Sequence, residues 1–489
     1  MLMKINQWIN DMNRQLFFLL GVMALFLCGC TMAPKYTRHK APIPAEWPQG
    51  RAYKSVQAAP GAERAPVLKW RDFFTDLRLQ KLIETALNNN RDLRLAALNV
   101  ERARALYGVQ RAELFPSVSA VGAGSKQRSS SDLTRPGEPR TTKRFNVDLG
   151  ITSWEIDFFG RIRSLKEQAL QEYLATEEAR RSAQIALVAG VSRAYLAFAA
   201  DRGNLKLARS TLETQQGVYD LIRRQYEVGL ANELDLRRAQ TQVDAARGDV
   251  ARIMQLVAQD QNALNLLAGS PVPEDLLPVD LSSVSAPKEI FPGMSSEALL
   301  NRPDIMAAEH RLKGAYAFIG VARAALFPRI ALTTSIGTAS DELSGLFNSG
   351  SGTWSFAPQI TMPIFDARTW AALRVSKTVR KIALTHYEKV IQTAFREVSD
   401  SLAVQGTVDR QVEAQQSLVN ALAETYRLSV NRYTNGIDSY LGVLDAQRSL
   451  YGAKQGLIAL RLAKIANRVS LYAVLGGGGD QPSVHQGGS

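Results

Sequence analysis

The sequence predicts a mainly α-helical fold that is internally duplicated and carries a small transmembrane β part. Residues 89–116 and 301–328 align without a gap, and 12 of their 28 paired positions are identical. Proline is absent from 140–270 and from 364–481, and both stretches are rich in the helix formers Ala, Leu, Gln, Glu and Arg. Short segments with strand-like alternation interrupt the helices at the same place in each half, as a duplicated architecture requires.

Two very long helices dominate this prediction. Residues 160–228 form one helical stretch, roughly 100 Å long at 1.5 Å per residue, which needs support from neighbouring helices. Its seam residues recur with the 3.5-residue period of a coiled coil: Leu205, Ala208, Leu212, Gln215, Tyr219, Ile222 and Tyr226. The second half repeats the seam at Val412, Gln415, Val419, Leu422, Tyr426, Ser429 and Tyr433. A plain two-helix coiled coil without a pore would show the same seam.

Each long helix is predicted to end in a hairpin tip with the pattern Tyr-x-x-Gly. Tyr226 and Gly229 in the first half correspond to Tyr433 and Gly436 in the second, at an offset of 207. Glycine suits the left-handed backbone conformation that ends many helices. A shorter helix is then expected to run back beside each long one.

The shorter helices are predicted to begin at capping side chains. Asn232 can cap the return helix of the first half, and Asp438 or Ser439 that of the second. Another helix begins at Asp92, which we predict to be its cap. This helix ends before Pro116, where the chain must become extended.

Four segments alternate apolar and polar residues and are predicted to be strands: 118–124, 145–152, 330–337 and 354–362. Strands of about ten residues cross a bilayer when tilted, and one apolar face is typical of a transmembrane barrel. A soluble sheet with one buried face would alternate in the same way. The polar, turn-rich segments 125–142 and 338–352 are predicted to be exposed loops.

Four strands cannot close a barrel, and open sheet edges are excluded from lipid. The chain is therefore predicted to oligomerise and to share one barrel between subunits. Two copies give eight strands and three give twelve. An eight-stranded barrel is filled by its own side chains, whereas a wider one leaves a lumen.

The N-terminus predicts export from the cytoplasm. Lys4 and Arg14 precede an apolar run at 16–27, which Cys28 and Cys30 follow, and this is the order of a secretory signal. The run is short for a membrane span. It resembles a bacterial lipobox, in which Cys30 becomes the lipidated first residue. An ordinary signal with two incidental cysteines is the alternative.

The composition argues against nucleic-acid binding and against catalysis. The net charge is +13, but Lys and Arg are scattered among Glu and Asp along the helices, and no nucleic-acid motif accompanies them. The four histidines show no metal-binding spacing, and neither H-E-x-x-H, G-x-S-x-G nor a phosphate loop is present. We predict no enzyme, no cofactor and no metal site.

Several motifs follow one another in the order of a known family. They are the lipobox, the Leu-Phe-Pro strand entry, SWEIDFFGR at 153–161, NRPDI at 301–305, PIFD at 363–366 and YLGVLDAQR at 440–448. Together they resemble the TolC-type outer-membrane factor family, and most closely its lipoprotein branch typified by OprM. The resemblance covers nearly the whole mature chain.

This resemblance implies a homotrimer with a twelve-stranded β-barrel in the Gram-negative outer membrane, continuing into a twelve-helix α-barrel in the periplasm. It implies the exit duct of a tripartite efflux pump, which passively conducts drugs or other small molecules. The implied partners are a periplasmic membrane-fusion adaptor, an inner-membrane RND-type pump and outer-membrane lipid. Service to a type I secretion system stays open, as does a binding lipoprotein whose coiled-coil arms hold partners without conducting.

On this basis the chain divides into six segments. They are a lipoprotein signal peptide (1–29), a lipid-anchored equatorial segment (30–78), a first structural repeat (79–270), an equatorial connector (271–292), a second structural repeat (293–475) and a flexible tail (476–489).

The resemblance also implies a periplasmic gate. Leu441, Asp445 and Arg448 match the family's constriction residues, and spacings of four and three put them on one helix face. A ring of leucines would block passage, a ring of aspartates would select by charge, and the arginines would pair with acidic groups. A solvated surface pair of Asp445 and Arg448 is the alternative. The corresponding positions of the first half hold Leu234, Arg238 and Thr241, so only the leucine is repeated.

Overall fold

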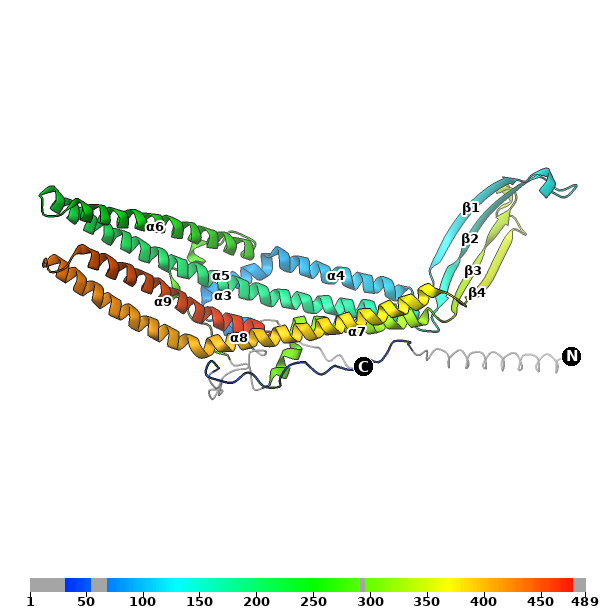
Figure 1. The fold of residues 1–489 in the computed structure, drawn as a ribbon. Helices are drawn as coiled ribbons and strands as arrows, with labels where there is room; N and C mark the ends of the chain where they lie inside the picture. The colour runs from blue at the N-terminus through cyan, green and yellow to red at the C-terminus, as the bar shows by residue number, and fades with distance from the viewer. Residues whose placement is uncertain (1–30, 54–67, 291–294, 478–489) are drawn as a thin grey trace. The chain divides into compact units, whose positions relative to one another are not determined.

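A computed structural model describes residues 31–53, 68–290 and 295–477 (Figure 1). The protein is mainly helical with one four-stranded sheet, so the predicted fold class is confirmed. The chain forms two compact units, and each unit takes segments from both sequence repeats. The sheet unit contains the described residues up to Lys40, Val100–Thr176 and Ala308–Tyr387. The hairpin unit contains Ala41–Asn99, Glu177–Ala307 and the described residues from Glu388 onward. The six predicted segments stay a prediction.

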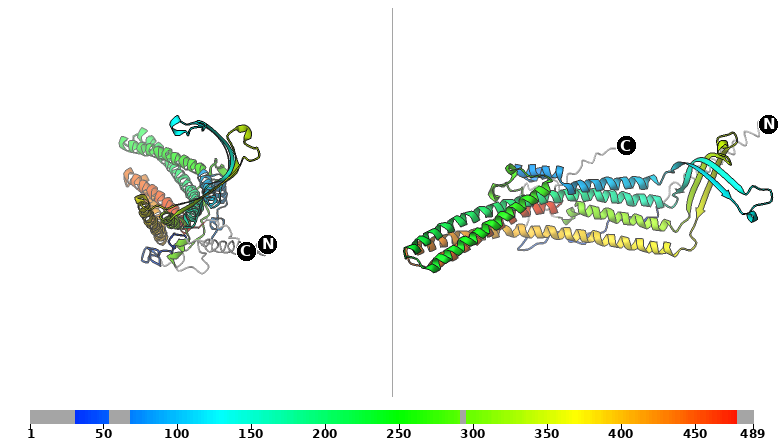
Figure 2. Two further views of the ribbon diagram at one scale, coloured as in Figure 1. Left: turned by 90° about the vertical axis from the view of Figure 1, so that its right-hand side faces the viewer. Right: turned by 90° about the horizontal axis from the view of Figure 1, so that it is seen from above.

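The sheet is antiparallel, its strands follow chain order, and it is curved (Figure 2). The strands are β1 (Val118–Arg128), β2 (Thr141–Ile156), β3 (Arg329–Ser340) and β4 (Gly352–Thr361). β1 and β4 are the edges. Both strands of the first hairpin are longer than predicted, so the loop expected at 125–142 is confined to 129–140. The reason is pairing: the polar residues 125–128 form a ladder with 141–144, which local alternation does not reveal.

One face of the sheet is apolar and exposed. Residues paired across antiparallel strands share a face, and the register gathers Phe145, Val147, Leu149, Ile151, Ile336, Trp354, Phe356 and Ile360 on one side. Trp354 is 78% exposed and Ile360 is 69% exposed. The opposite face carries polar residues such as Asn146, Asp148 and Ser335. An apolar sheet face left open on this scale indicates an interaction surface.

A β-bulge keeps β2 in phase with this pattern. The register shifts between Ile151 and Trp154, and Ser153 has a positive φ of 54°. Ile151 pairs with Thr334 and Trp154 with Leu332, so both side chains lie on the apolar face despite their odd spacing.

A charged joint connects β2 to the first long helix, α5 (Arg161–Glu227). Glu155 accepts hydrogen bonds from Nε and Nη2 of Arg161, both at 2.8 Å. Gly160 between them has a φ of 74°. The motif at 153–161 is therefore the turn from strand to helix, and the helix predicted at 160–228 is confirmed to within one residue at each end.

The second long helix, α8 (Ala367–Thr434), also has an acidic side chain bonded at its start. The carboxylate of Asp366 accepts the backbone N–H of Arg368 at 2.9 Å. Return helices α6 (Glu233–Ala268) and α9 (Tyr440–Val474) run alongside α5 and α8 (Figure 1). The seam prediction is largely confirmed, because Ala208, Gln215, Ile222 and Val419 are all buried.

Arg302 ties three helices together in the hairpin unit. It precedes α7 (Pro303–Ala324) and forms two bonds with Asp304, at 2.7 and 2.6 Å. Its Nη1 also donates to Glu397 of α8 and to the carbonyl of Val474 at the end of α9, both at 2.9 Å. The motif at 301–305 is therefore a structural joint.

The cap predicted for α4 (Arg91–Ala112) is wrong. Asn90, not Asp92, accepts the backbone N–H of Leu93, at 2.9 Å. The amide of Asn90 also donates to the carbonyl of Leu267 at 3.0 Å, and this contact with α6 selects it as the cap. Asp92 lies in the first turn, where a negative charge favours the helix dipole.

Short elements complete the hairpin unit. They are α2 (Trp70–Phe73) and α3 (Leu77–Asn89), together with the 3₁₀ turns Glu274–Leu276, Leu281–Ser283 and Ser296–Asn301. The segment after α6 packs against α3, because Arg78 donates to the carbonyl of Ser283 at 2.7 Å.

Candidate functional site at the hairpin tips

Both tips end their long helix with the same backbone turn. Gly229 has a φ of 78° and Gly436 a φ of 70°, the left-handed region. The backbone N–H that follows each glycine bonds to the carbonyl five residues earlier. These bonds are Leu230 to Gln225 at 2.7 Å and Ile437 to Arg432 at 2.9 Å. The glycines of the Tyr-x-x-Gly pattern therefore occupy positions that a side chain would strain.

The first tip is held by a side-chain cap. The Oδ1 of Asn232 accepts the backbone N–H of Asp235 at 2.8 Å, as predicted for α6. The amide of Asn232 donates to the Asp235 carboxylate at 2.9 Å. Tyr226 is 41% exposed and lies outside the tip core.

The second tip is held differently: the predicted cap position of α9 is confirmed, but no side-chain capping bond is formed there. Ser439 stands at the N-cap, but its side chain makes no capping bond. Asp438 instead pairs with Arg432, whose Nη2 donates at 3.1 Å. This hydrogen bond and the positive charge hold the pKa of Asp438 below its ordinary value. The turn is thus held by an ion pair between the residues on either side of it, Arg432 and Asp438, and not by a side-chain cap.

Tyr440 anchors the tip core. It is 2% exposed, and its ring lies 5.3 Å from that of Tyr433. It packs with Ile222 of α5, Ala239 of α6 and Val443 of its own helix. Burial, with smaller contributions from neighbouring tyrosines and Asp235, raises the pKa of Tyr440, so its hydroxyl stays neutral. All four helices of the two hairpins therefore meet in one core at the tips.

The three predicted gate residues lie together on the exposed face of α9. Leu441 is 53% exposed, and Asp445 and Arg448 are also exposed, whereas Val443 and Gln447 beside them are buried. Within the described chain, neither Asp445 nor Arg448 has an ion-pair partner. The surface pair that the sequence also allowed is thus not formed, and both charges are available to groups outside this chain.

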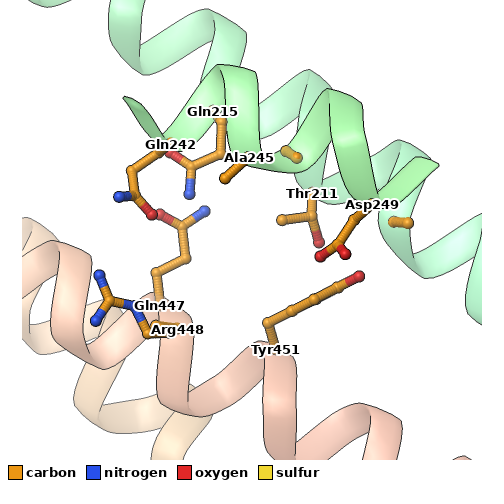
Figure 3. Close-up of a pocket in the computed structure, with 10 residues that line it drawn as sticks. Thr211, Gln215, Gln242, Ala245, Asp249, Gln447, Arg448 and Tyr451 are labelled. Atoms are coloured by element: carbon orange, nitrogen blue, oxygen red, sulfur yellow. The ribbon is translucent and has the colours of Figure 1, made fainter. Parts of the chain in front are cut away.

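Arg448 also borders a cavity of about 160 Å³ between α5, α6 and α9 (Figure 3). Thr211, Gln215, Gln242, Asp249, Gln447 and Tyr451 line it as well. Gln215 and Gln447 are more than nine-tenths buried, and their Oε1 atoms have no donor among the described residues. Sequence reasoning placed Gln215 on the seam but missed this cavity. The sequence feature that could have indicated it is Gln215 itself, a glutamine in a seam whose other members are apolar or aromatic.

Comparison with known proteins identifies a matching family and several similar proteins. The sequence model of the family described as outer membrane efflux protein matches residues 82–270 and 294–477. The chain is similar to two Pseudomonas putida proteins, the probable efflux pump outer membrane protein TtgC and the antibiotic efflux pump outer membrane protein ArpC. Each is 49% identical over 461 residues, which is 94% of this chain and 95% of the relative. It is also similar to the solved open state of the Neisseria gonorrhoeae MtrE outer membrane channel. Identity is 38% and the TM-score 0.80, with 92% of this chain and 98% of that chain covered.

Proposed function

Because the chain belongs to the outer membrane efflux protein family and is an outer-membrane exit duct of efflux systems, we propose that it conducts as a homotrimer. The observation that carries this is the open sheet. Among the described residues no further strand pairs with its edges β1 and β4, while one face presents a broad apolar and exposed surface. Three such sheets give twelve strands, which close without edges in lipid and leave a lumen lined by the polar face.

The helices supply the periplasmic part of the duct in this proposal. Three copies of the four long helical elements give the twelve-helix tunnel. Three copies of Leu441 narrow it at the tips, and three copies of Asp445 give the constriction a negative ring. Support comes from their shared exposure on α9 and from the absence of an ion-pair partner for Asp445 or Arg448 within the described chain. Arg448 then pairs with acidic groups of a neighbouring subunit.

The tips also offer a surface for the pump's other components. Val228 and Leu230 at the first tip and Ile437 at the second are 70%, 81% and 61% exposed. Exposed apolar side chains at a turn suit contact with another protein. The proposed partners are a periplasmic membrane-fusion adaptor and, through it, an RND-type pump of the inner membrane. The cargo is drugs or other small molecules, in line with the name of one relative, the antibiotic efflux pump outer membrane protein ArpC.

The assembly is tested on the full-length chain purified in mild detergent. We expect native mass spectrometry to give a trimer and planar bilayers to show discrete channel openings. A monodisperse, folded monomer contradicts the sheet argument. A trimer that never conducts, even with Leu441→Ala and Arg448→Ala, favours instead the binding lipoprotein whose coiled-coil arms hold partners.

Lipidation is tested separately. Cys30 lies outside the described residues, and we propose it as the acylated N-terminus of the mature chain on its lipobox-like sequence. Mass spectrometry of protein from the outer membrane should find acyl chains on this cysteine. Cleavage at another residue, or an unmodified thiol, contradicts the assignment. Cys30→Ser behind a non-lipoprotein signal should still insert in part, because strands and not acyl chains span the membrane.

A further inference from the structure

The β1–β2 hairpin carries a concentration of positive charge at its far end. Residues 125–144 contain Lys126, Arg128, Arg135, Arg140, Lys143 and Arg144 but only two acidic residues, Asp132 and Glu138. In the sequence these cations are spread over twenty positions and give no stripe. Strand pairing brings them together, because the ladder runs past the apolar segment to Arg128 and Thr141.

The register sorts these cations between the two faces of the sheet. Lys126 pairs with Lys143, and the neighbouring pair on the same face is Gly124 with Phe145. Lys126, Lys143 and Arg128 therefore continue the apolar face that carries Phe145. Arg144, which pairs with Ser125, points to the polar face. The lipid-facing side thus passes from apolar to cationic within one pair of residues.

The position of this change is set by the strands. β1 follows α4 and β2 leads into α5, so the turn between β1 and β2 is the end remote from both helices. Phe145 is the last apolar residue of β2 before that end, and Trp354 is the apolar residue of β4 nearest to it; aromatic residues at such positions are typical of the girdle of a barrel. Lys143 lies two residues beyond Phe145, roughly 7 Å farther along the strand. In the proposed duct this level is the outer surface of the membrane.

Within one chain this arrangement is electrostatically unfavourable. Lysines directly opposite one another on a sheet destabilise it. Among the described residues, Lys126, Arg128 and Lys143 form no ion pair, although Asp341 and Glu342 follow β3 nearby. A bound anion at this level would offset the repulsion.

We propose that Lys126, Arg128 and Lys143 bind the phosphate groups of the phosphorylated glycolipid in the outer leaflet of the outer membrane. The apolar face below them receives the acyl chains of the same lipid molecule. This two-part match favours a lipid over free phosphate, which lacks chains. The proposal rests on the barrel of the proposed function, because it requires this face to contact lipid.

The test measures lipid binding to the full-length trimer in detergent by native mass spectrometry. The probes are diphosphoryl lipid A, its dephosphorylated form and inorganic phosphate. The variant Lys126→Gln/Lys143→Gln removes two charges from the lipid-facing side. Its matched control, Arg135→Gln/Arg144→Gln, removes two charges from the loop and the polar face of the same hairpin. Lys126→Arg/Lys143→Arg keeps the charges.

We expect diphosphoryl lipid A to bind wild type more tightly than its dephosphorylated form does. The glutamine variant should weaken it more than tenfold, since each basic residue near an anionic lipid surface contributes about fivefold. The control should change it less than twofold, and the arginine variant should retain it. Equal loss in variant and control, equal binding of both lipid forms, or displacement by micromolar phosphate overturns the proposal. A trimer that still conducts but shows any of these results rejects the lipid site alone, whereas failure to form a conducting trimer rejects the proposed function.

Discussion

The two hairpin tips share one turn and differ in what holds it. At the first tip, Asn232 caps the return helix and Tyr226 is exposed. At the second, Arg432 pairs with Asp438, and Tyr433 packs on the buried Tyr440. The glycine turn survives in both copies because few other residues take its backbone conformation. Side-chain contacts around the turn are replaceable, so the copies were free to take different roles.

The same contrast extends to the proposed gate. Leu234 and Leu441 occupy matching positions and are 58% and 53% exposed, so both copies present the same bulk. The charges differ: Asp445 and Arg448 correspond to Arg238 and Thr241, and Arg238 already lies 3.7 Å from Asp235 of its own helix. We infer that, at these matching positions, only the second tip has charges free to act between subunits.

The largest expected effect comes from substitutions at the second tip, which should widen the channel there. Leu441→Ala with Arg448→Ala removes bulk and a proposed tether three times over in a trimer, so single-channel conductance should rise several-fold. Cells should also become leaky to large antibiotics. The matched control, Leu234→Ala with Arg238→Ala, should change both much less. If the two double variants behave alike, with the trimer intact, the gate is not confined to the second tip.

A second prediction concerns charge selection. Asp445→Ala removes the negative ring, so the preference of the channel for cations should fall while conductance changes little. Reversal potentials across a salt gradient measure this. Arg238→Ala at the matching position of the first tip should leave them unchanged. If Asp445→Ala keeps the cation preference of wild type, other residues determine the selectivity.

A third prediction separates the two tip tyrosines. Tyr433→Ala leaves a gap beside Tyr440 and should lower the free energy of local opening by about 2 kcal/mol. Tyr226→Ala removes a ring that is 41% exposed and lies outside the tip core, so it should cost about 0.5 kcal/mol or less. Hydrogen exchange at the start of α9 and of α6 reports each opening. Equal costs would show that the two tips are packed alike.

A smaller effect is expected at the caps. Asn232→Ala removes a capping bond and should cost about 1 kcal/mol, seen as faster hydrogen exchange in the first turn of α6. Ser439→Ala removes no such bond and should stay within about 0.5 kcal/mol. A large effect of the serine would mean that it caps α9 in the assembled trimer.

The two coiled coils also differ in their response to pH. Burial, and then the nearby Asp201, raises the pKa of Asp260 to about 6, whereas the matching Asn467 is neutral and donates to the carbonyl of Ser401. Because the folded-state pKa lies above the ordinary 3.8, the stability from this carboxyl is present at low pH and is lost as pH rises through about 6. Asp260→Asn should therefore stabilise the fold by on the order of 1 kcal/mol at pH 7.5.

Thermal unfolding followed by circular dichroism checks this sign. The difference between Asp260→Asn and wild type should nearly vanish at about pH 3, where the carboxyl is protonated in both the folded and the unfolded chain. A benefit of the same size at both pH values would show that packing, and not ionisation, separates the two residues.

Local patterns predicted the long helices well and the joints poorly. The seam and the lack of proline fixed α5 to within one residue at each end, because helix periodicity is a local property. The cap of α4 was misassigned because two residues near its start, Asn90 and Asp92, can cap, and a distant carbonyl, that of Leu267, selects Asn90. The far end of β1 was missed because its polar residues are held by their partners in β2. The cavity beside Arg448 requires three helices to be placed together, which no single segment encodes.

The bulge at Ser153 divides β2 into two parts, and the alternation of outward-facing residues changes parity between them. Upstream of it, odd-numbered residues from Phe145 to Ile151 face outward; downstream, the even-numbered Trp154 does. Deleting one residue here would exchange the roles of Trp154 and Glu155, presenting a carboxylate to lipid and unmaking its bond with Arg161. The extra residue thus separates the alternation of the apolar segment from that of the joint between β2 and α5. A substitution in one part therefore does not require a compensating substitution in the other.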